Sequence, residues 1–315
     1  MKISKYLIGI GVLSIGLLIS SCGLLDSQKK GEDRIYKGSG AVGDVVTFTI
    51  DQDKKTIRVT NAETNEDFSG TYVVQSDGSY LITYNGETFR AWEIPGVLMA
   101  AVIPRNDNGD KTNMLSVAAA QGVHDRSALV GDYNFISMKA PNQQGSFYGT
   151  YNVTVDSGIT HTSYSVSDNV KQEGEPKTEP ESSFTFNGSE FKSTNPQDTW
   201  TAYITEKGVF IIDFSEGSGG IVGAPLATPE SIDGEFLVIT GDGNIGTVSV
   251  QGTAVTYSFP DDNGSMTVSQ IFPGIYQGDV PSGPRITFTI LPGKAFFGNY
   301  RNNDGSHGNF IGMKK

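Results

Sequence analysis

Short runs of β-branched and aromatic residues, separated by tight-turn pairs, recur through most of the sequence. Val45–Ile50 is one such run, and Tyr80–Tyr84 and Val209–Phe214 are others. Such runs are typical of strands, because branched and aromatic side chains pack well on a pleated surface. Asn-Gly or Asp-Gly pairs begin at residues 77, 85, 108, 187, 233, 242, 263 and 304. These pairs tolerate the positive φ of hairpin turns. The pattern predicts an all-β protein of antiparallel meanders, in which only Asn113–Gly122 fits a short helix as well as a strand.

Two kinds of internal repetition support this interpretation. Residues 35–50 (IYKGSGAVGDVVTFTI) and 275–290 (IYQGDVPSGPRITFTI) are identical at eight of 16 positions. A second motif, Phe-x-Gly-[Thr/Asn]-Tyr, occurs at Phe68–Tyr72, Phe147–Tyr151 and Phe296–Tyr300. In a strand its Phe, Gly and Tyr share one face, and the glycine leaves room for a neighbouring ring. We interpret the motif as core packing, with an aromatic ligand platform as the alternative.

The segment 171–181 (KQEGEPKTEPE) is the strongest candidate for a domain boundary. It is rich in glutamate and proline and has almost no apolar residue, a composition typical of linkers and exposed loops. We therefore expect two β-sandwich or barrel-like domains, at 35–170 and 182–315. One large β domain, with this segment as a long loop, is the alternative.

The first 22 residues have the organisation of an export signal. Lys2 and Lys5 precede the apolar run Tyr6–Ile19, which is shorter than the ~20 residues that a membrane-spanning helix needs. The sequence Ile19-Ser20-Ser21-Cys22 follows, and Cys22 is the only cysteine of the chain. This segment resembles the lipobox of bacterial lipoproteins, in which an aliphatic residue and two small residues precede a cysteine.

The resemblance implies that the signal peptide, residues 1–21, is removed and that Cys22 then carries acyl chains such as palmitate. Two or more acyl chains hold a protein firmly on a membrane. Gly23 stands where enterobacterial lipoproteins of the inner membrane have aspartate, so the resemblance favours the outer membrane. Residues 22–34 lack periodicity and are expected to form the lipidated N-terminus and a flexible tether. The rest of the chain resembles uncharacterised β-rich bacterial lipoproteins only in general style.

The charge of the chain limits its partners. With 23 basic and 35 acidic residues, the net charge is −12, which argues against a nucleic-acid partner. Removal of residues 1–21 takes away two lysines and no acid, so the charge becomes −14. Anionic lipid headgroups repel such a chain. We therefore expect contact with the membrane through the lipid on Cys22.

No residue pattern nominates a catalytic or cofactor-binding site. Gly-x-Gly-x-x-Gly stretches at 38–43 and 241–246 lead into strand-like runs, whereas a dinucleotide site requires a helix there. We interpret both stretches as turns. Trp92 lies beside Arg90 and Glu93 near a turn. It is a weak candidate for an exposed ligand-binding ring.

No metal site is nominated either. The three histidines lack metal-ligand spacing, and the acidic turns at 106–110, 261–263 and 302–304 lack the spacing of an EF-hand loop.

Three classes of function remain open. The first is a non-catalytic binding, adhesion or scaffold module that meets a protein or glycan. The second is a periplasm-facing small-ligand carrier or envelope-assembly factor, which predicts an apolar pocket between sheets that tyrosine-rich strands could line. The third is a hydrolase with an unrecognised site, which predicts carboxylates that converge in one cleft. The sequence favours the first class, and it leaves the oligomeric state open.

Overall fold

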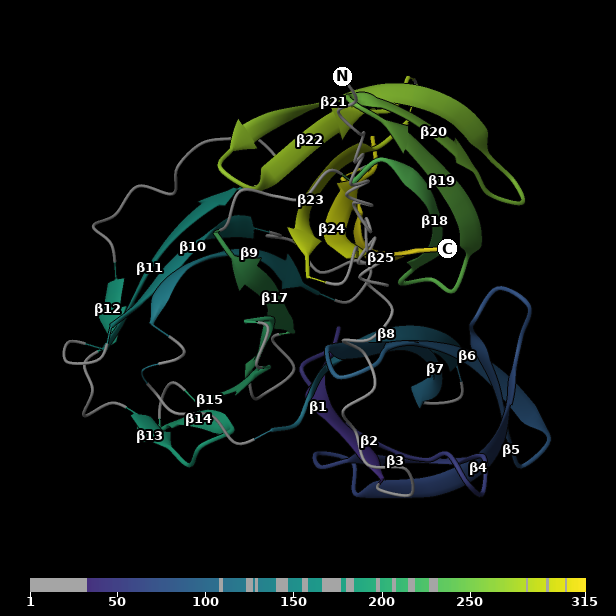
Figure 1. Ribbon diagram of the computed structural model, residues 1–315, viewed down its shortest axis with the longest axis vertical. Helices are drawn as coiled ribbons and strands as arrows, with labels where there is room; N and C mark the ends of the chain where they lie inside the picture. Colours follow the sequence, from purple (N-terminus) through teal and green to yellow (C-terminus); the bar gives the residue numbers. More distant parts are fainter. Residues whose placement is uncertain are drawn as a thin grey trace, which may run out of the picture.

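The computed structural model describes residues 33–107, 110–122, 127, 130–139, 147–154, 158–165, 177–179, 184–196, 199–205, 208–214, 219–226, 232–281, 283–292, 295–303 and 305–315. Within these ranges the chain forms β-strands that pair with one another in antiparallel fashion. The all-β prediction is therefore confirmed. The strands form three sheets, namely two closed eight-stranded barrels and, between them in sequence, an open nine-stranded sheet (Figure 1). Within the described ranges, no helix has the length and apolarity that a membrane crossing requires.

The first barrel is a continuous meander in which each strand pairs with the next. Its strands are β1 (Arg34–Gly40), β2 (Val45–Asp51), β3 (Thr56–Asn61), β4 (Glu66–Val74), β5 (Tyr80–Tyr84), β6 (Glu87–Ile94), β7 (Leu98–Asp107) and β8 (Asp110–Ala120). The barrel closes where β1 pairs with β8, with Tyr36 opposite Ala120. The ambiguous segment Asn113–Gly122 therefore contributes to a strand, and pairing on both sides of β8 explains why.

The open sheet follows. Its strands are β9 (Gly131–Met138), β10 (Phe147–Thr154), β11 (Gly158–Ser165), β12 (Lys177–Glu179), β13 (Phe184–Phe186), β14 (Glu190–Ser193), β15 (Trp200–Ile204), β16 (Phe210–Phe214) and β17 (Gly220–Pro225). The strand order is β12-β11-β10-β9-β17-β16-β15-β14-β13, so β9 pairs with β17 in the middle and β12 and β13 are the two edges.

The second barrel repeats the meander of the first. Its strands are β18 (Gly234–Thr240), β19 (Ile245–Gln251), β20 (Ala254–Ser258), β21 (Asn263–Phe272), β22 (Ile275–Asp279), β23 (Arg285–Leu291), β24 (Ala295–Arg301) and β25 (His307–Lys314). Closure occurs where β18 pairs with β25, with Ile239 opposite Ile311.

The expected division at 171–181 does not coincide with the boundaries of the sheets. Those boundaries lie between Ala120 and Gly131 and between Pro225 and Gly234. Lys177–Glu179 is β12, which pairs with β11 at one edge of the open sheet. Charged residues and proline are common at sheet edges because they discourage pairing with other chains. The composition that suggests a linker therefore also suits the edge of this sheet.

The two similar segments, 35–50 and 275–290, form hairpins at different positions in their barrels. Residues 35–50 span β1 and β2, which open the first barrel, whereas 275–290 span β22 and β23, which are the fifth and sixth strands of the second. By strand order, β1 corresponds to β18 and β2 to β19. Sequence similarity and barrel position therefore follow different correspondences.

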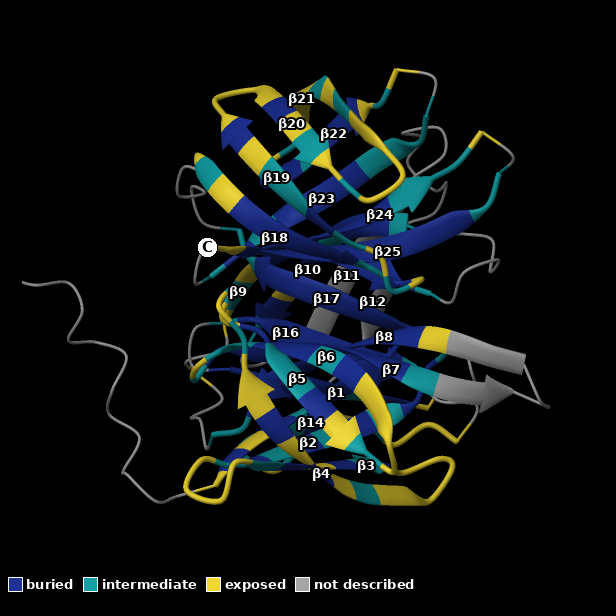
Figure 2. Cartoon of the chain, turned by 90° about the vertical axis from the view of Figure 1, so that its right-hand side faces the viewer, coloured by how far each residue is buried: buried dark blue, intermediate teal, exposed yellow. Residues whose placement is uncertain are grey.

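A shared apolar core joins the three sheets. Ile136 and Met138 of β9, Val222 of β17 and Ile239 of β18 belong to one cluster with the interior of the first barrel. The interior of the second barrel and the other face of the open sheet form clusters of their own. Figure 2 shows buried segments of the open sheet between the second barrel above and the first barrel below. Both barrels are thus fixed against the same sheet.

Candidate ligand cavity in the second barrel

A cavity of about 340 Å³ lies inside the second barrel. Much of its wall is apolar and comes from inward-facing strand positions, among them Val238, Val250, Val255, Phe288 and Phe296. Alternate residues of a strand point to opposite faces, so a barrel of this kind presents one face of each strand to its interior. Concave, mostly apolar spaces of this size are typical of small-ligand sites.

One end of the cavity is polar. Three hairpin turns of the barrel supply its polar lining at that end, namely Thr240, Asp242 and Asn244 from β18–β19, Asp261 and Asp262 from β20–β21, and Asn302 from β24–β25. Successive antiparallel hairpins place alternate turns at the same end of a meander, so these side chains gather at one mouth. The turn holds Asp242 in place, because its carboxylate accepts hydrogen bonds from the Thr240 hydroxyl and, at 2.9 Å, from the Asn244 amide.

At one hairpin the inward side chains of the second barrel are smaller than those at the matching positions of the first. In the first barrel Phe48 and Ile50 of β2 are fully buried, and Ile50 lies opposite Ile57. The corresponding hairpin has valine at all three of these positions, with Val248 and Val250 on β19 and Val255 opposite Val250 on β20. Each replacement by valine removes carbon atoms that would otherwise occupy the interior.

Aromatic rings packed over glycines shape the wall of the cavity. Gly298 of β24 lies opposite Phe310 of β25, and Phe296 of β24 lies opposite Gly312. A Cβ built on Gly298 would lie 2.5 Å from Cζ of Phe310, and one on Gly312 would lie 2.1 Å from Cζ of Phe296. The rings therefore occupy the space above the glycines. For the copy of the Phe-x-Gly-x-Tyr motif at 296–300, this confirms the interpretation of the glycine as room for a ring; Phe296 and Tyr300 also line the cavity.

Two tyrosines, Tyr257 and Tyr300, line the cavity together with the carboxylates of the mouth. Burial, together with the negative charge of Asp242, raises the pKa of Tyr300 to about 12. Burial and the charge of Asp262 likewise raise the pKa of Tyr257. Both phenols are therefore neutral at physiological pH, and both line the cavity as hydrogen-bonding groups on aromatic rings.

The first barrel contains a buried polar cluster. The side chain of Glu93 is 1% exposed and pairs with Arg34 at 2.7 Å. Its carboxylate also accepts hydrogen bonds from the hydroxyls of Tyr36 and Tyr80. Burial and the charge of Glu93 raise the pKa of both phenols, which remain protonated donors. Because Arg34, Tyr36 and Tyr80 all bind this carboxylate, we interpret Glu93 as a residue that stabilises the barrel.

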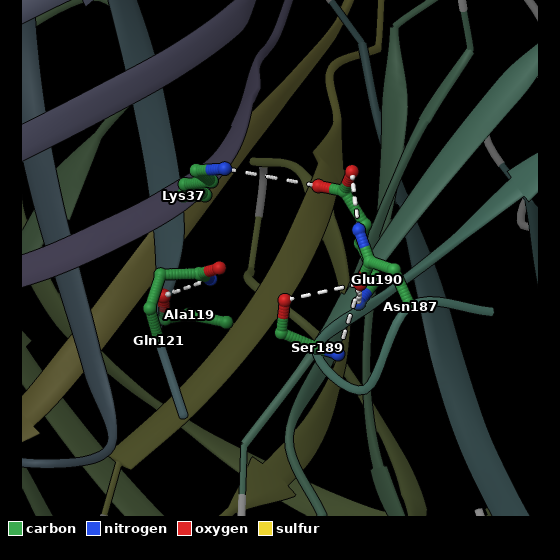
Figure 3. Close-up of polar contacts among 6 residues, drawn as sticks. All are labelled: Lys37, Ala119, Gln121, Asn187, Ser189 and Glu190. Carbon is green, nitrogen blue, oxygen red and sulfur yellow. Dashed lines mark hydrogen bonds and ion pairs between the residues drawn. The ribbon is translucent and has the colours of Figure 1, made fainter. Parts of the chain in front are cut away.

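The junction of the first barrel with the open sheet carries a second set of polar contacts (Figure 3). Lys37 of β1 lies 3.8 Å from the carboxylate of Glu190, at the start of β14. Asn187 donates to the same carboxylate at 3.0 Å and accepts from Ser189 at the turn before β14. Nearby, the side-chain amide of Gln121 donates to the backbone carbonyl of Ala119 at the end of β8. Of these contacts, the Lys37–Glu190 pair joins β1 to the start of β14, and both of its side chains are partly exposed.

The residues singled out by the sequence fall in different places. Cys22 lies outside the described residues, as do the signal peptide and most of the tether. Trp92 is 4% exposed on β6, so its ring is buried rather than available for stacking at the surface. Asp261 and Asp262 form part of the hairpin turn expected of them, and that turn borders the cavity.

The remaining motifs are turns where they are described. The stretches 38–43 and 241–246 run through the β1–β2 and β18–β19 hairpins, as expected. Within the described ranges, no three His, Cys, Asp or Glu side chains group closely enough to hold a metal ion. The sequence does not locate the cavity, because its wall is assembled from seven strands, β18–β21 and β23–β25. The carrier alternative predicts an apolar pocket between sheets, whereas this cavity lies inside one barrel, with Tyr257 and Tyr300 in its lining.

Comparisons with known proteins give structural likeness only. No protein-family model matches the chain, and no curated protein resembles it in sequence. Transferrin binding protein B of serogroup B Neisseria meningitidis is 9% identical over 86% of this chain, with a TM-score of 0.25. A double mutant of transferrin binding protein B from Haemophilus parasuis is 10% identical over 86% of this chain, with a TM-score of 0.28. This chain spans 65% of the length of each of these two proteins.

A third neighbour is a protein of unknown function from the DUF3598 family of Nostoc punctiforme. It is 10% identical, with a TM-score of 0.21, and the likeness covers 91% of this chain and 96% of that one.

Proposed function

We propose that this chain is a non-catalytic binding protein whose second barrel holds a small, largely apolar ligand. The observation behind the proposal is the 340 Å³ cavity with its apolar wall and polar mouth. Burial of apolar surface releases about 25 cal/mol per Å², so such a wall favours an apolar ligand over water. Of the three classes open from the sequence, this is the small-ligand carrier.

The contrast between the two barrels supports the proposal. Both have eight strands in the same order, and the first buries Phe48, Ile50 and Ile57 where the second has three valines. Protein interiors are close-packed, and an unfilled space lowers stability. We attribute the smaller side chains at the matching positions of the second barrel to a ligand that occupies the space they leave.

We also propose that the protein is attached to a bacterial envelope through acyl chains on Cys22. The support is the lipobox Ile19-Ser20-Ser21-Cys22 behind a basic and apolar leader. The acidic chain offers anionic lipid no attraction of its own. The outer membrane is the proposed location.

The cavity is tested by refilling it with the side chains of the first barrel. The triple variant Val248→Phe, Val250→Ile and Val255→Ile places the residues of positions 48, 50 and 57 at the corresponding positions of the second barrel. The purified protein is titrated with the neutral fluorophore N-phenyl-1-naphthylamine, whose emission rises in apolar surroundings. We expect saturable binding to the unaltered protein and its loss in the triple variant.

Controls separate occlusion of the cavity from unfolding. Val73→Phe adds bulk on β4, where Val73 is 63% exposed, and should leave binding unchanged. A thermal melt of each variant shows whether it remains folded. If the triple variant fails to fold, the single variant Val255→Ile is used instead and should weaken binding. Undiminished binding to a folded refilled variant would rule out the cavity as the site.

A further inference from the structure

We propose that the ligand of this cavity is a hydrophobic amine, with an apolar body in the barrel and a cationic ammonium group at the mouth. The inference rests on the proposed function, because it names the class of ligand for the same cavity. The apolar wall accounts for the body of the ligand, and the charges and rings at the mouth account for its head.

The charged side chains that line the cavity are all acidic. Asp242, Asp261 and Asp262 border it, and no lysine, arginine or histidine occurs among its described lining residues. Like charges in a cleft with low-dielectric walls reinforce one another and raise the local concentration of the opposite charge. A cation is therefore attracted to this mouth, whereas a carboxylate or sulfate group is repelled.

Two basic residues near the barrel ends are engaged elsewhere, and a third, Arg301 at the end of β24, is not among the residues that line the cavity. Arg285 begins β23 near the mouth, does not line the cavity, and pairs with Asp279 at 2.8 Å. Lys314 lies beside the first residue of β18 and donates to the carbonyl of Asp233 at 2.7 Å. The acids of the β20–β21 turn thus have no basic counterpart among the described lining residues.

Aromatic rings line the same cavity as these acids. Tyr300 and Tyr257 line the cavity together with Asp242 and Asp262, whose charges contribute to the raised pKa of the two phenols. Ring faces attract ammonium groups, by about 0.5–1 kcal/mol at exposed sites and more where water is excluded. Carboxylates combined with aromatic rings suit an ammonium group better than they suit a neutral alcohol.

The rest of the wall argues against a strongly polar ligand. Away from the mouth the lining is mostly valine, isoleucine and phenylalanine. A sugar buried there would lose its bonds to water without replacement, which costs free energy for every hydroxyl. Polar recognition is therefore confined to one end, as an amphiphilic amine requires.

The test compares three decyl compounds that differ in the charge of the head group. Decyltrimethylammonium, 1-decanol and decyl sulfate, each below its micelle-forming concentration, are used to displace N-phenyl-1-naphthylamine from the purified full chain at low salt. We expect the ammonium compound to bind about tenfold more tightly than the sulfate, a difference of about 1.4 kcal/mol. The preference should shrink as salt screens the mouth.

A matched pair of double variants separates the mouth from the overall charge. Asp261→Asn with Asp262→Asn should reduce the preference for ammonium over sulfate several-fold and leave binding of 1-decanol unchanged. Asp53→Asn with Glu66→Gln removes the same charge from exposed positions on the first barrel and should leave the preference intact.

The outcomes distinguish this inference from the proposed function. If the fluorophore and 1-decanol bind but the sulfate binds as tightly as the ammonium, the cavity binds apolar ligands and the assignment to amines is wrong. The assignment is equally wrong if both double variants reduce the preference alike. If no compound displaces the fluorophore and the fluorophore itself does not bind, both the proposed function and this inference fail.

Discussion

Ser39 donates a hydrogen bond of 2.5 Å to Asp213 across the junction between the first barrel and the open sheet. Ser39 lies on β1 and Asp213 on β16, and both are 0% exposed. The second carboxylate oxygen of Asp213 has no hydrogen-bond partner among the described residues. A carboxyl group in this position is costly to ionise.

The first prediction is that Asp213 makes the stability of the protein depend on pH. Burial raises the pKa of Asp213 from its ordinary value of 3.8 to about 7, with the charges of Glu63 and Asp44 adding to the effect and the bond from Ser39 opposing it. The folded state thus keeps a proton that the unfolded chain loses. The free energy of unfolding should therefore be highest below the unfolded pKa and should fall as pH rises toward 7, by at most about 4 kcal/mol.

Asp213→Asn tests the origin of this slope. Asparagine is neutral at every pH, so chemical denaturation at several values between about pH 4 and pH 8 should give a flatter profile and a more stable protein at the upper end. Asp53→Asn removes an exposed acid from the turn after β2 and should leave the slope as it was. A slope that persists in Asp213→Asn would show that other groups are responsible.

The second prediction concerns attachment to the membrane. Cys22→Ala removes the acceptor of the acyl chains, and the acidic chain has no attraction to anionic lipid that could replace them. We expect this variant to leave the membrane fraction and remain folded, as judged by fractionation after a high-salt wash and by circular dichroism. Ser21→Ala keeps a small residue before the cysteine and should remain with the membrane. Retention of Cys22→Ala after the wash would contradict lipid attachment.

The sequence predicts the strands and turns well because both depend on local patterns. Asn85 and Gly86 adopt positive φ in the β5–β6 hairpin, and Gly243 does so in the β18–β19 turn, as Asn-Gly and Asp-Gly pairs lead one to expect. Closure of a barrel is different, because it depends on pairing between strands far apart in sequence, such as β1 with β8. No local pattern marks that pairing, and the number of sheets could not be predicted.

The sequence does not place the cavity inside a barrel, because the volume of a cavity depends on which side chains face one another across its interior. Val248 and Val250 fit a strand as well as Phe48 and Ile50 do. The register of β19 with β20 is needed to show that Val255 lies beside Val250, so that a third small side chain enlarges the same space. Trp92 illustrates the converse, since its neighbours Arg90 and Glu93 suggest exposure. The adjacent Glu93 is itself buried among Arg34 and two tyrosines, and a sequence does not reveal a buried ion pair.

The third prediction compares the same glycine of the internal repeat in two surroundings. Gly38 and Gly278 occupy matching positions of 35–50 and 275–290. A Cβ on Gly38 would lie 2.0 Å from the backbone oxygen of Val117, so β1 and β8 would have to separate. A Cβ on Gly278 would lie 3.0 Å from a side-chain methyl carbon of Val268 and 3.1 Å from the oxygen of Thr267, which small shifts can relieve.

Gly38→Ala should therefore destabilise the protein by about 2–3 kcal/mol, as overpacking against backbone does, while Gly278→Ala should cost less than about 1 kcal/mol. The measurement is the free energy of unfolding of each variant in denaturant, with fluorophore binding recorded alongside. Because β1 also carries Ser39, separation of β1 from β8 should disturb the contact with Asp213 and alter the pH profile of Gly38→Ala but not that of Gly278→Ala. Equal destabilisation by the two substitutions would mean that closure of the first barrel at β1 and β8 is not as tight as these contacts require.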